Sequence, residues 1–231
     1  MRALDIPDID TKFIEGHYAV VRQLLDSSLP DTHIHDEFTG TDIVAFCQRF
    51  GLRYDQGQVR FRWLDNNLCK HTFGLEDLSA PVDQLSNINP PVKQVIITEN
   101  KTNFLSFPSG QNALILFGQG YAIDLIAKLP WLQDKQIFYW GDIDTHGFHI
   151  LDRLRNKLPQ VNSLLMGKET LLKFRKFRGK EKPEKRFTHP LSYLTHEEKK
   201  LYQALIDNEY AENLRLEQER IPLGWLKQSF P

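Results

Sequence analysis

Short, nearly continuous apolar runs mark the middle of the chain. They lie at 94–98 (QVIIT), 113–117 (ALILF) and 136–140 (QIFYW). Such runs are typical of strands buried on both faces, as in a parallel sheet. Apolar residues then recur at helical spacing at 120–130, which Pro130 ends, and at 150–158. Alternating strands and helices predict an open α/β sheet with right-handed crossovers.

The region before these runs has a different pattern. Apolar spacing predicts amphipathic helices at 11–26 and 41–50, and polar–apolar alternation predicts a strand at 59–65. Two helices followed by a strand are the outline of a small winged-helix-like module. Residues 79–93 are rich in proline, asparagine and serine, which predicts a domain boundary there.

Two domains are therefore expected, a winged-helix-like module at about 1–85 and an α/β domain at about 92–231. Within the second domain, residues 161–166 predict a fourth strand. Thr195, with a glutamate three residues on, has the pattern of a capping box and predicts the start of the last helix pair. That pair is expected to end in the segment NLRLEQERIP (213–222).

The composition is that of a globular chain, with 41% hydrophobic and 26% charged residues. No run approaches the roughly 18 apolar residues of a membrane span, and the N-terminus lacks the apolar stretch of a secretory signal. The two cysteines, Cys47 and Cys69, are too few for a disulfide framework. We therefore expect a cytoplasmic protein without a membrane segment.

The net charge of −1 hides a basic segment at 168–186, where nine bases face three acids. Two phenylalanines lie among these bases, and basic segments with interleaved aromatics can bind nucleic-acid phosphates. The alternative is a solvated surface loop, because Gly179 and Pro183 interrupt any helix there. The first candidates for DNA contact are Lys173, Arg175, Lys176, Arg178 and Lys180.

Acidic residues follow two of the predicted strands. Glu99 comes directly after the strand at 94–98, and Asp142 and Asp144 follow the strand at 136–140. Ligands bind at the carboxyl ends of strands in open parallel sheets, and residues i and i+2 of extended backbone point the same way. Three converging carboxylates repel unless they are neutralised, so the pattern predicts a site for Mg²⁺ or Mn²⁺. Taken singly, each acid can also be turn chemistry.

Two neighbours extend this candidate site. Lys101, two residues beyond Glu99, could steady a phosphate or be an exposed loop lysine. His146 could carry a proton, or it could be a structural or solvent-facing residue near a helix start. Oxygen-ligated Mg²⁺ is typical of phosphoryl transfer.

The same segments resemble a known family. VIITENKTNFLSFP, ALILFGQGYAIDLIAKLPWL, IFYWGDIDTHGFHILDRLR and LRLEQERIP are similar to the C-terminal part of the JetD family, the nuclease subunits of Wadjet plasmid-defence systems. The arrangement of one glutamate and Asp-x-Asp resembles the Toprim domain, which is shared with the A subunit of type VI topoisomerases. The likeness covers about residues 5–222.

This resemblance implies a fold and a function. Glu99, Asp142 and Asp144 fall on the Toprim acidic triad, which binds Mg²⁺ and supports cleavage of double-stranded DNA. The family implies a homodimer that acts with an SMC-type motor complex, onto which a further N-terminal region docks. By this resemblance the chain begins at the winged-helix region, without that docking region. Tyr18 and Tyr54 match no nucleophile motif, so hydrolysis by water is expected.

Two other functions stay open at the level of sequence. The first is a DNA-binding module in which the Toprim-like sheet is only a scaffold. The second is a haloacid-dehalogenase-type phosphatase, whose opening motif fits Asp142-Ile143-Asp144-Thr145. That class also needs a later lysine and acidic pair. Lys168 could be the lysine, but no adjacent acidic pair follows at a strand end.

Overall fold

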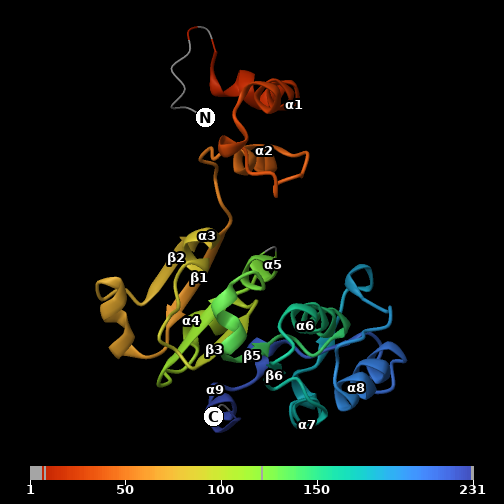
Figure 1. The fold of residues 1–231 in the computed structure, drawn as a ribbon. Helices are drawn as coiled ribbons and strands as arrows, with labels where there is room; N and C mark the ends of the chain where they lie inside the picture. Colours follow the sequence, from red (N-terminus) through yellow and green to blue (C-terminus); the bar gives the residue numbers. More distant parts are fainter. Residues whose placement is uncertain (1–6, 8, 121, 230–231) are drawn as a thin grey trace. The chain divides into compact units, whose positions relative to one another are not determined.

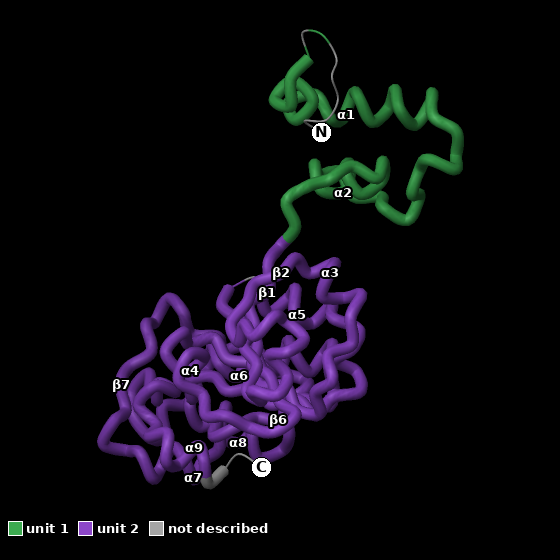
Figure 2. Tube along the Cα trace, turned by 90° about the vertical axis from the view of Figure 1, so that its left-hand side faces the viewer, with its two compact units in different colours: residues 1–56 green, residues 57–231 purple. Residues whose placement is uncertain are grey.

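The computed structural model of the chain describes residues 7, 9–120 and 122–229. It divides into two compact units, residues 1–56 and 57–231 (Figure 2). Each unit is described by itself. In the described part of the chain, no helix is both long enough and apolar enough to cross a membrane.

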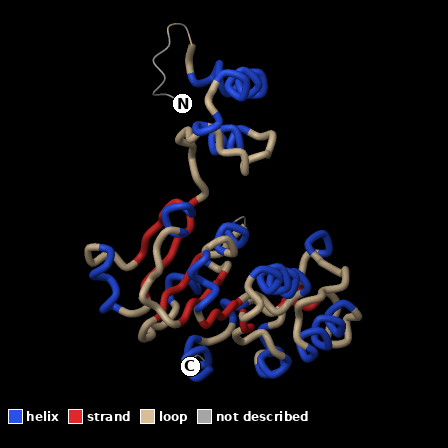
Figure 3. Tube along the Cα trace, in the orientation of Figure 1, coloured by secondary structure: helices blue, strands red, loops and turns tan. Residues whose placement is uncertain are grey.

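The smaller unit is helical, and the larger unit mixes strands and helices (Figures 1 and 3). The described α-helices are α1 (Thr11–Ser28), α2 (Ile43–Arg49), α3 (Val82–Ser86), α4 (Lys101–Ser106), α5 (Ala122–Ile126), α6 (Thr145–Lys157), α7 (Lys168–Lys173), α8 (His196–Ile206) and α9 (Leu223–Ser229). The strands are β1 (Gln58–Trp63), β2 (Asp77–Pro81), β3 (Gln94–Thr98), β4 (Ala113–Phe117), β5 (Gln136–Trp140), β6 (Val161–Ser163), β7 (Gly179–Lys180) and β8 (Leu214–Arg215).

The larger unit is built on a six-stranded sheet in the order β2-β1-β4-β3-β5-β6. Strands β4, β3, β5 and β6 are parallel, and β1 and β2 add an antiparallel hairpin at one edge. Helices flank this sheet, which confirms the predicted α/β class and is consistent with a Toprim-like fold (Figure 3).

The three apolar runs form the centre of the sheet, as predicted. In β3, Val95, Ile96 and Ile97 are all fully buried. Neighbouring residues of a strand point to opposite faces, so a run buried at every position must be covered on both sides. The continuous apolar pattern of β3, β4 and β5 therefore follows from helices packing on both faces.

The small unit pairs α1 with α2. Asp10 caps α1 by accepting a hydrogen bond from the backbone N–H of Phe13 at 2.7 Å, and Asp42 caps α2 in the same way. Ile14 on α1 and Phe46 on α2 belong to its small apolar core. These are the two helices that the sequence predicted.

The strand predicted at 59–65 is β1, and it lies in the large sheet rather than with the two helices. It pairs with β2 on one side and β4 on the other. The compact units consequently divide at residues 56 and 57, upstream of the boundary predicted within 79–93. That stretch instead holds the end of β2 and helix α3.

The C-terminal segment also differs from its prediction. Residues 213–222 were expected to end a helix, but they contain the short strand β8. Leu216 then forms an isolated antiparallel bridge with Ile143, with N–O distances of 2.9 and 3.0 Å. Leu214 and Leu216 are buried while Arg215 and Glu217 are less so, and this alternation is that of extended backbone. The segment therefore runs beside the loop that carries Asp142 and Asp144.

Candidate active site

The carboxyl ends of β3 and β5 form a switch point in the sheet. Helix α4 leads from β3 to β4 on one side, whereas α6 leads from β5 to β6 on the other side. Thr98 at the end of β3 pairs with Trp140 at the end of β5, so the next residues of both strands leave the sheet side by side. Loops that leave in opposite directions open a crevice between two strand ends, where ligands bind in such sheets.

A pocket of about 280 Å³ lies at this point. Glu99 reaches it from β3, and Asp142 and Asp144 reach it from the loop after β5, as the sequence predicted. Glu181 adds a fourth carboxylate from the segment after β7. The pocket also contains three cationic side chains, those of Lys182, Lys185 and Arg215.

Asp142 is held by the C-terminal segment. Its Oδ2 accepts hydrogen bonds from Nε and Nη2 of Arg215, at 2.9 and 2.6 Å. Its Oδ1 accepts one from the backbone N–H of Gln218, at 2.8 Å. The bridge between Ile143 and Leu216 keeps these partners in register with the loop.

Asp144 is buried at the start of α6, where it also caps the helix. Its Oδ1 accepts a hydrogen bond from the backbone N–H of Gly147 at 2.7 Å, and its Oδ2 lies 3.3 Å from Nε of Arg215. Burial and the nearby charge of Glu181 raise the pKa of Asp144 to about 7, against the hydrogen bond from Gly147. Its carboxyl group is therefore only partly ionised at neutral pH.

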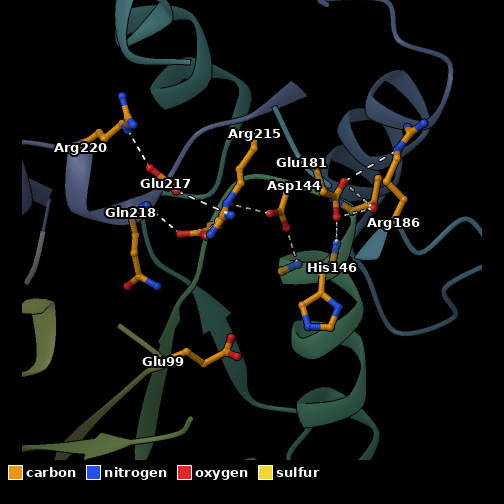
Figure 4. A network of polar contacts seen from close by, with 12 residues as sticks. Glu99, Asp144, His146, Glu181, Arg186, Arg215, Glu217, Gln218 and Arg220 are labelled. Atoms are coloured by element: carbon orange, nitrogen blue, oxygen red, sulfur yellow. Dashed lines mark hydrogen bonds and ion pairs between the residues drawn. The ribbon is translucent and has the colours of Figure 1, made fainter. Parts of the chain in front are cut away.

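Glu181 lies beside Asp144 at the same helix end (Figure 4). Its carboxylate accepts hydrogen bonds from the hydroxyl of Thr145 at 2.8 and 2.9 Å and from the backbone N–H of His146 at 3.2 Å. The exposed N–H groups and dipole of a helix N-terminus stabilise negative charge. This helix end therefore carries two carboxylates.

Glu99 stands apart from those contacts (Figure 4). Its carboxyl group accepts a hydrogen bond from the hydroxyl of Tyr139 at 2.5 Å. Burial raises the pKa of Glu99 to about 7, with a further contribution from Asp142 and against the hydrogen bond from Tyr139. A carboxyl group with a pKa near the working pH can both accept and donate a proton.

Gln218 joins the parts of the site. Its side-chain oxygen accepts hydrogen bonds from the hydroxyl of Thr98 at 2.6 Å and from the side-chain amide of Asn103 at 3.1 Å. Its backbone N–H binds Asp142, and the residue is 3% exposed. The end of β3, helix α4 and the loop after β5 are thus tied to one residue.

The two accessory residues lie in different places. His146 lines the pocket from the first turn of α6, and desolvation of its ring lowers its pKa, which favours the neutral imidazole. Lys101 is exposed at the start of α4, outside the residues that line the pocket.

The five DNA-binding candidates fall into two groups. Arg175 and Lys176 are exposed on a short 3-10 turn. The other three have partners within the chain: Lys173 lies 3.2 Å from the ring centroid of Trp225, Arg178 donates to a backbone carbonyl, and Lys180 lies 2.6 Å from Glu212. The basic segment also continues to the pocket, through Lys182 and Lys185.

Sequence reasoning missed Glu181, Arg215 and Gln218 as site residues. Glu181 is one of three acids in a run of bases, and that was its only signal. The other two lie in the segment read as helical. Its alternating Leu214-Arg215-Leu216-Glu217 is a period-2 pattern and would have indicated a strand.

The donors in the pocket are of the kind that a hard divalent cation prefers, since Glu99, Asp142 and Asp144 offer carboxylate oxygens. Two of them have raised pKa values, chiefly because burial outweighs the hydrogen bonds and positive charges that act on them. Among the residues that the structure describes, no group of three or more His, Cys, Asp or Glu side chains is arranged to hold a metal ion. The donor chemistry fits Mg²⁺, but Arg215 is paired with two of the donors.

Comparisons with known proteins give a family. The model of the family described as "Wadjet protein JetD, C-terminal" matches residues 51–230, which is 180 of the 231 residues. A second family, described as an uncharacterised N-terminal region conserved in bacteria, matches residues 1–26. No curated protein matches the chain.

Proposed function

Because the chain belongs to the family of the C-terminal part of the Wadjet protein JetD, we propose that it is a metal-dependent endonuclease of a Wadjet defence system. The proposed reaction is hydrolysis of phosphodiester bonds in double-stranded plasmid DNA. The observation that carries this proposal is the meeting of Glu99 from β3 with Asp142 and Asp144 from β5 in one pocket.

Asp142 and Asp144, together with Glu99, would hold Mg²⁺ or Mn²⁺. Such an ion, when bound, stabilises charge on phosphoryl oxygens and makes water a better nucleophile. Glu99, with its pKa of about 7, would move a proton at the same place. The hydroxyl of Tyr139 would hold that carboxyl group in position.

The bases next to the pocket support DNA as the substrate. Lys182 and Lys185 stand at the pocket itself, and Arg175 and Lys176 are exposed on the same basic segment. Basic side chains next to an acidic pocket can bind the DNA phosphates on either side of the reacting bond. We propose that these residues contact the DNA backbone without reading its sequence.

Family membership implies association with an SMC-type motor complex. Cleavage of both strands would need two pockets, so we propose that the chain acts as a homodimer. The helices of residues 1–56 would belong to the winged-helix-like region that contacts DNA. The Toprim relation of that domain is part of the same proposal.

The test is nicking of supercoiled plasmid with Mg²⁺ or Mn²⁺, by wild type and by Glu99→Ala. We expect wild type to nick only with the metal, and Glu99→Ala to be slower by about a hundredfold or more, as for a lost acid or base. Asp124→Ala is a matched control, because Asp124 is an exposed carboxylate that pairs with Arg153. Equal nicking by wild type and Glu99→Ala would remove the role of Glu99.

DNA binding without nicking, even at high protein concentration, would instead support the non-catalytic scaffold. Metal-dependent hydrolysis of a small phosphomonoester, without any DNA cleavage, would support a phosphatase. Either outcome would contradict the proposed nuclease activity.

A further inference from the structure

Arg215 lies where a cation bound by the two aspartates would lie. Its Nε and Nη2 donate to Oδ2 of Asp142, and its Nε lies 3.3 Å from Oδ2 of Asp144. Its Nη1 lies 3.6 Å from Glu217. One guanidinium group therefore faces three carboxylates, and it is the cation paired with both aspartates (Figure 4).

All four oxygens of the two aspartates already face an N–H group. Oδ1 of Asp142 accepts from the backbone of Gln218, and Oδ1 of Asp144 accepts from the backbone of Gly147. The remaining oxygen of each aspartate faces Arg215. Oδ2 of Asp142 accepts two hydrogen bonds from Arg215, which occupy both of its lone pairs, so a divalent cation must compete with the guanidinium for this oxygen.

The backbone fixes Arg215 beside the loop. Arg215 pairs with Gly179 in the β7–β8 ladder, and the next residue, Leu216, bridges to Ile143. The guanidinium cannot lose its charge in the physiological pH range, so deprotonation of Arg215 does not release the aspartates from it. When both aspartates are ionised, their release requires the Arg215 side chain to move.

We propose, on the basis of the metal-dependent function proposed above, that Arg215 is an internal counter-ion which a divalent cation must displace from Asp142 and Asp144. Without metal, Arg215 holds the like charges of the pocket together. It thereby weakens metal binding below what the carboxylates alone would give. Arg215 is a positioning residue in this account.

The test is titration of the protein with Mn²⁺ by isothermal calorimetry, for wild type and Arg215→Gln. A pH of about 8.5 keeps the carboxyl groups of Glu99 and Asp144 ionised, because their pKa values are about 7. We expect Arg215→Gln to bind Mn²⁺ about tenfold or more tightly than wild type, which is the scale of a charged hydrogen bond. Arg220→Gln is the matched control, because Arg220 pairs with Glu217 and is 49% exposed, and its affinity should stay within about twofold.

The melting temperature, measured with and without Mn²⁺, distinguishes a counter-ion that the metal displaces from a residue that only supports the structure. Without metal, Arg215→Gln should melt at a lower temperature than wild type, because the pocket loses its counter-ion. Saturating Mn²⁺ should then raise the melting temperature more in the variant than in wild type. A residue with only a structural role would give equal shifts with Mn²⁺.

If Arg215→Gln binds Mn²⁺ no more tightly than wild type, the proposal that the metal displaces Arg215 is wrong. The proposed nuclease activity would not be affected by that result. Absence of Mn²⁺ binding in both proteins would overturn the metal site itself, and this inference with it. Should Arg215→Gln fail to fold, Arg215→Lys keeps the charge but loses the forked geometry. It should bind Mn²⁺ more tightly than wild type, and an unchanged affinity would overturn the proposal.

Discussion

The larger unit holds acidic side chains in two opposite environments, one around Glu198 and the other at the pocket of Glu99 and Asp144. Burial alone would raise the pKa of Glu198, but hydrogen bonds from Arg155, Ser163 and the backbone of Thr195 lower it to about 2. At the ends of β3 and β5, burial raises the pKa values of Glu99 and Asp144 to about 7. The hydrogen bonds to Glu198 outweigh the cost of its burial, whereas the contacts of Glu99 and Asp144 do not outweigh theirs.

This difference indicates which of the two has a structural role. A buried ion pair with all its hydrogen bonds made is complete, and it ties α6 to α8 through Arg155 and Glu198. A pocket with unbalanced carboxylates is unfavourable until a proton or a cation arrives. Perturbed pKa values of this second kind are typical of functional sites.

The largest effect is expected from a substitution that breaks the ion pair of Arg155 with Glu198. Arg155→Met would leave Glu198, whose side chain is 9% exposed, ionised and without its main partner. We expect the free energy of unfolding to fall by about 3–5 kcal/mol at pH 7, measured by urea denaturation. The double variant Arg155→Met, Glu198→Met should recover part of this loss. A loss below about 1 kcal/mol in the single variant would mean that the pair is not the compensated site described here.

The next prediction is a gain in the free energy of unfolding, and it concerns Glu99. Its pKa in the folded protein, about 7, lies above the ordinary value of 4.5 for a glutamate, so ionisation removes stability as pH rises between these values. Gln has no such cost and can still accept from the hydroxyl of Tyr139. Glu99→Gln should therefore be more stable than wild type by about 3 kcal/mol at pH 8.5, and by less than about 1 kcal/mol at pH 5.

Urea denaturation at both pH values without metal measures this difference. Glu219→Gln is the control, because Glu219 is exposed and accepts one hydrogen bond from Asn100. Its stability relative to wild type should not change with pH. A pH-independent difference for Glu99→Gln would mean that Glu99 is well solvated.

The smallest expected effect concerns the backbone that holds the aspartates. A Cβ atom at Gly147 would lie 2.2 Å from the backbone oxygen of Asp142 and 3.3 Å from Oδ1 of Asp144. Gly147→Ala must therefore displace the loop, at a cost of about 1–3 kcal/mol in the free energy of unfolding. Gly224→Ala, where a Cβ meets nothing within 4 Å, should not destabilise the protein in the same assay. Equal stability of the two variants would contradict the close approach at Gly147.

Much of the fold was predictable because its signals are local. The runs of β3, β4 and β5 fall at the predicted residues, and the Thr195 capping box forms as expected. The place of β1 was not predictable, since alternation shows that a strand has two different faces but not which strand it pairs with. Strand β1 pairs with β4, whose residues lie far from it in the sequence.

The candidate site was predictable only in part, for the same reason. Glu99 and the two aspartates follow apolar strands directly, so their meeting in one pocket followed from the rule for parallel sheets. Arg215 and Gln218 come more than 70 residues later than Asp142 and reach it through an isolated bridge. A pattern within one segment cannot give such a pairing.

The most direct test of the central claim is a crystal structure of the protein grown with Mn²⁺, with anomalous scattering recorded from the metal. The account predicts an anomalous peak bound to Asp142 and Asp144 at about 2.1 Å, on the side of the pocket that Glu99 faces. Anomalous density only at surface carboxylates, with Arg215 still paired to both aspartates at saturating Mn²⁺, would contradict it.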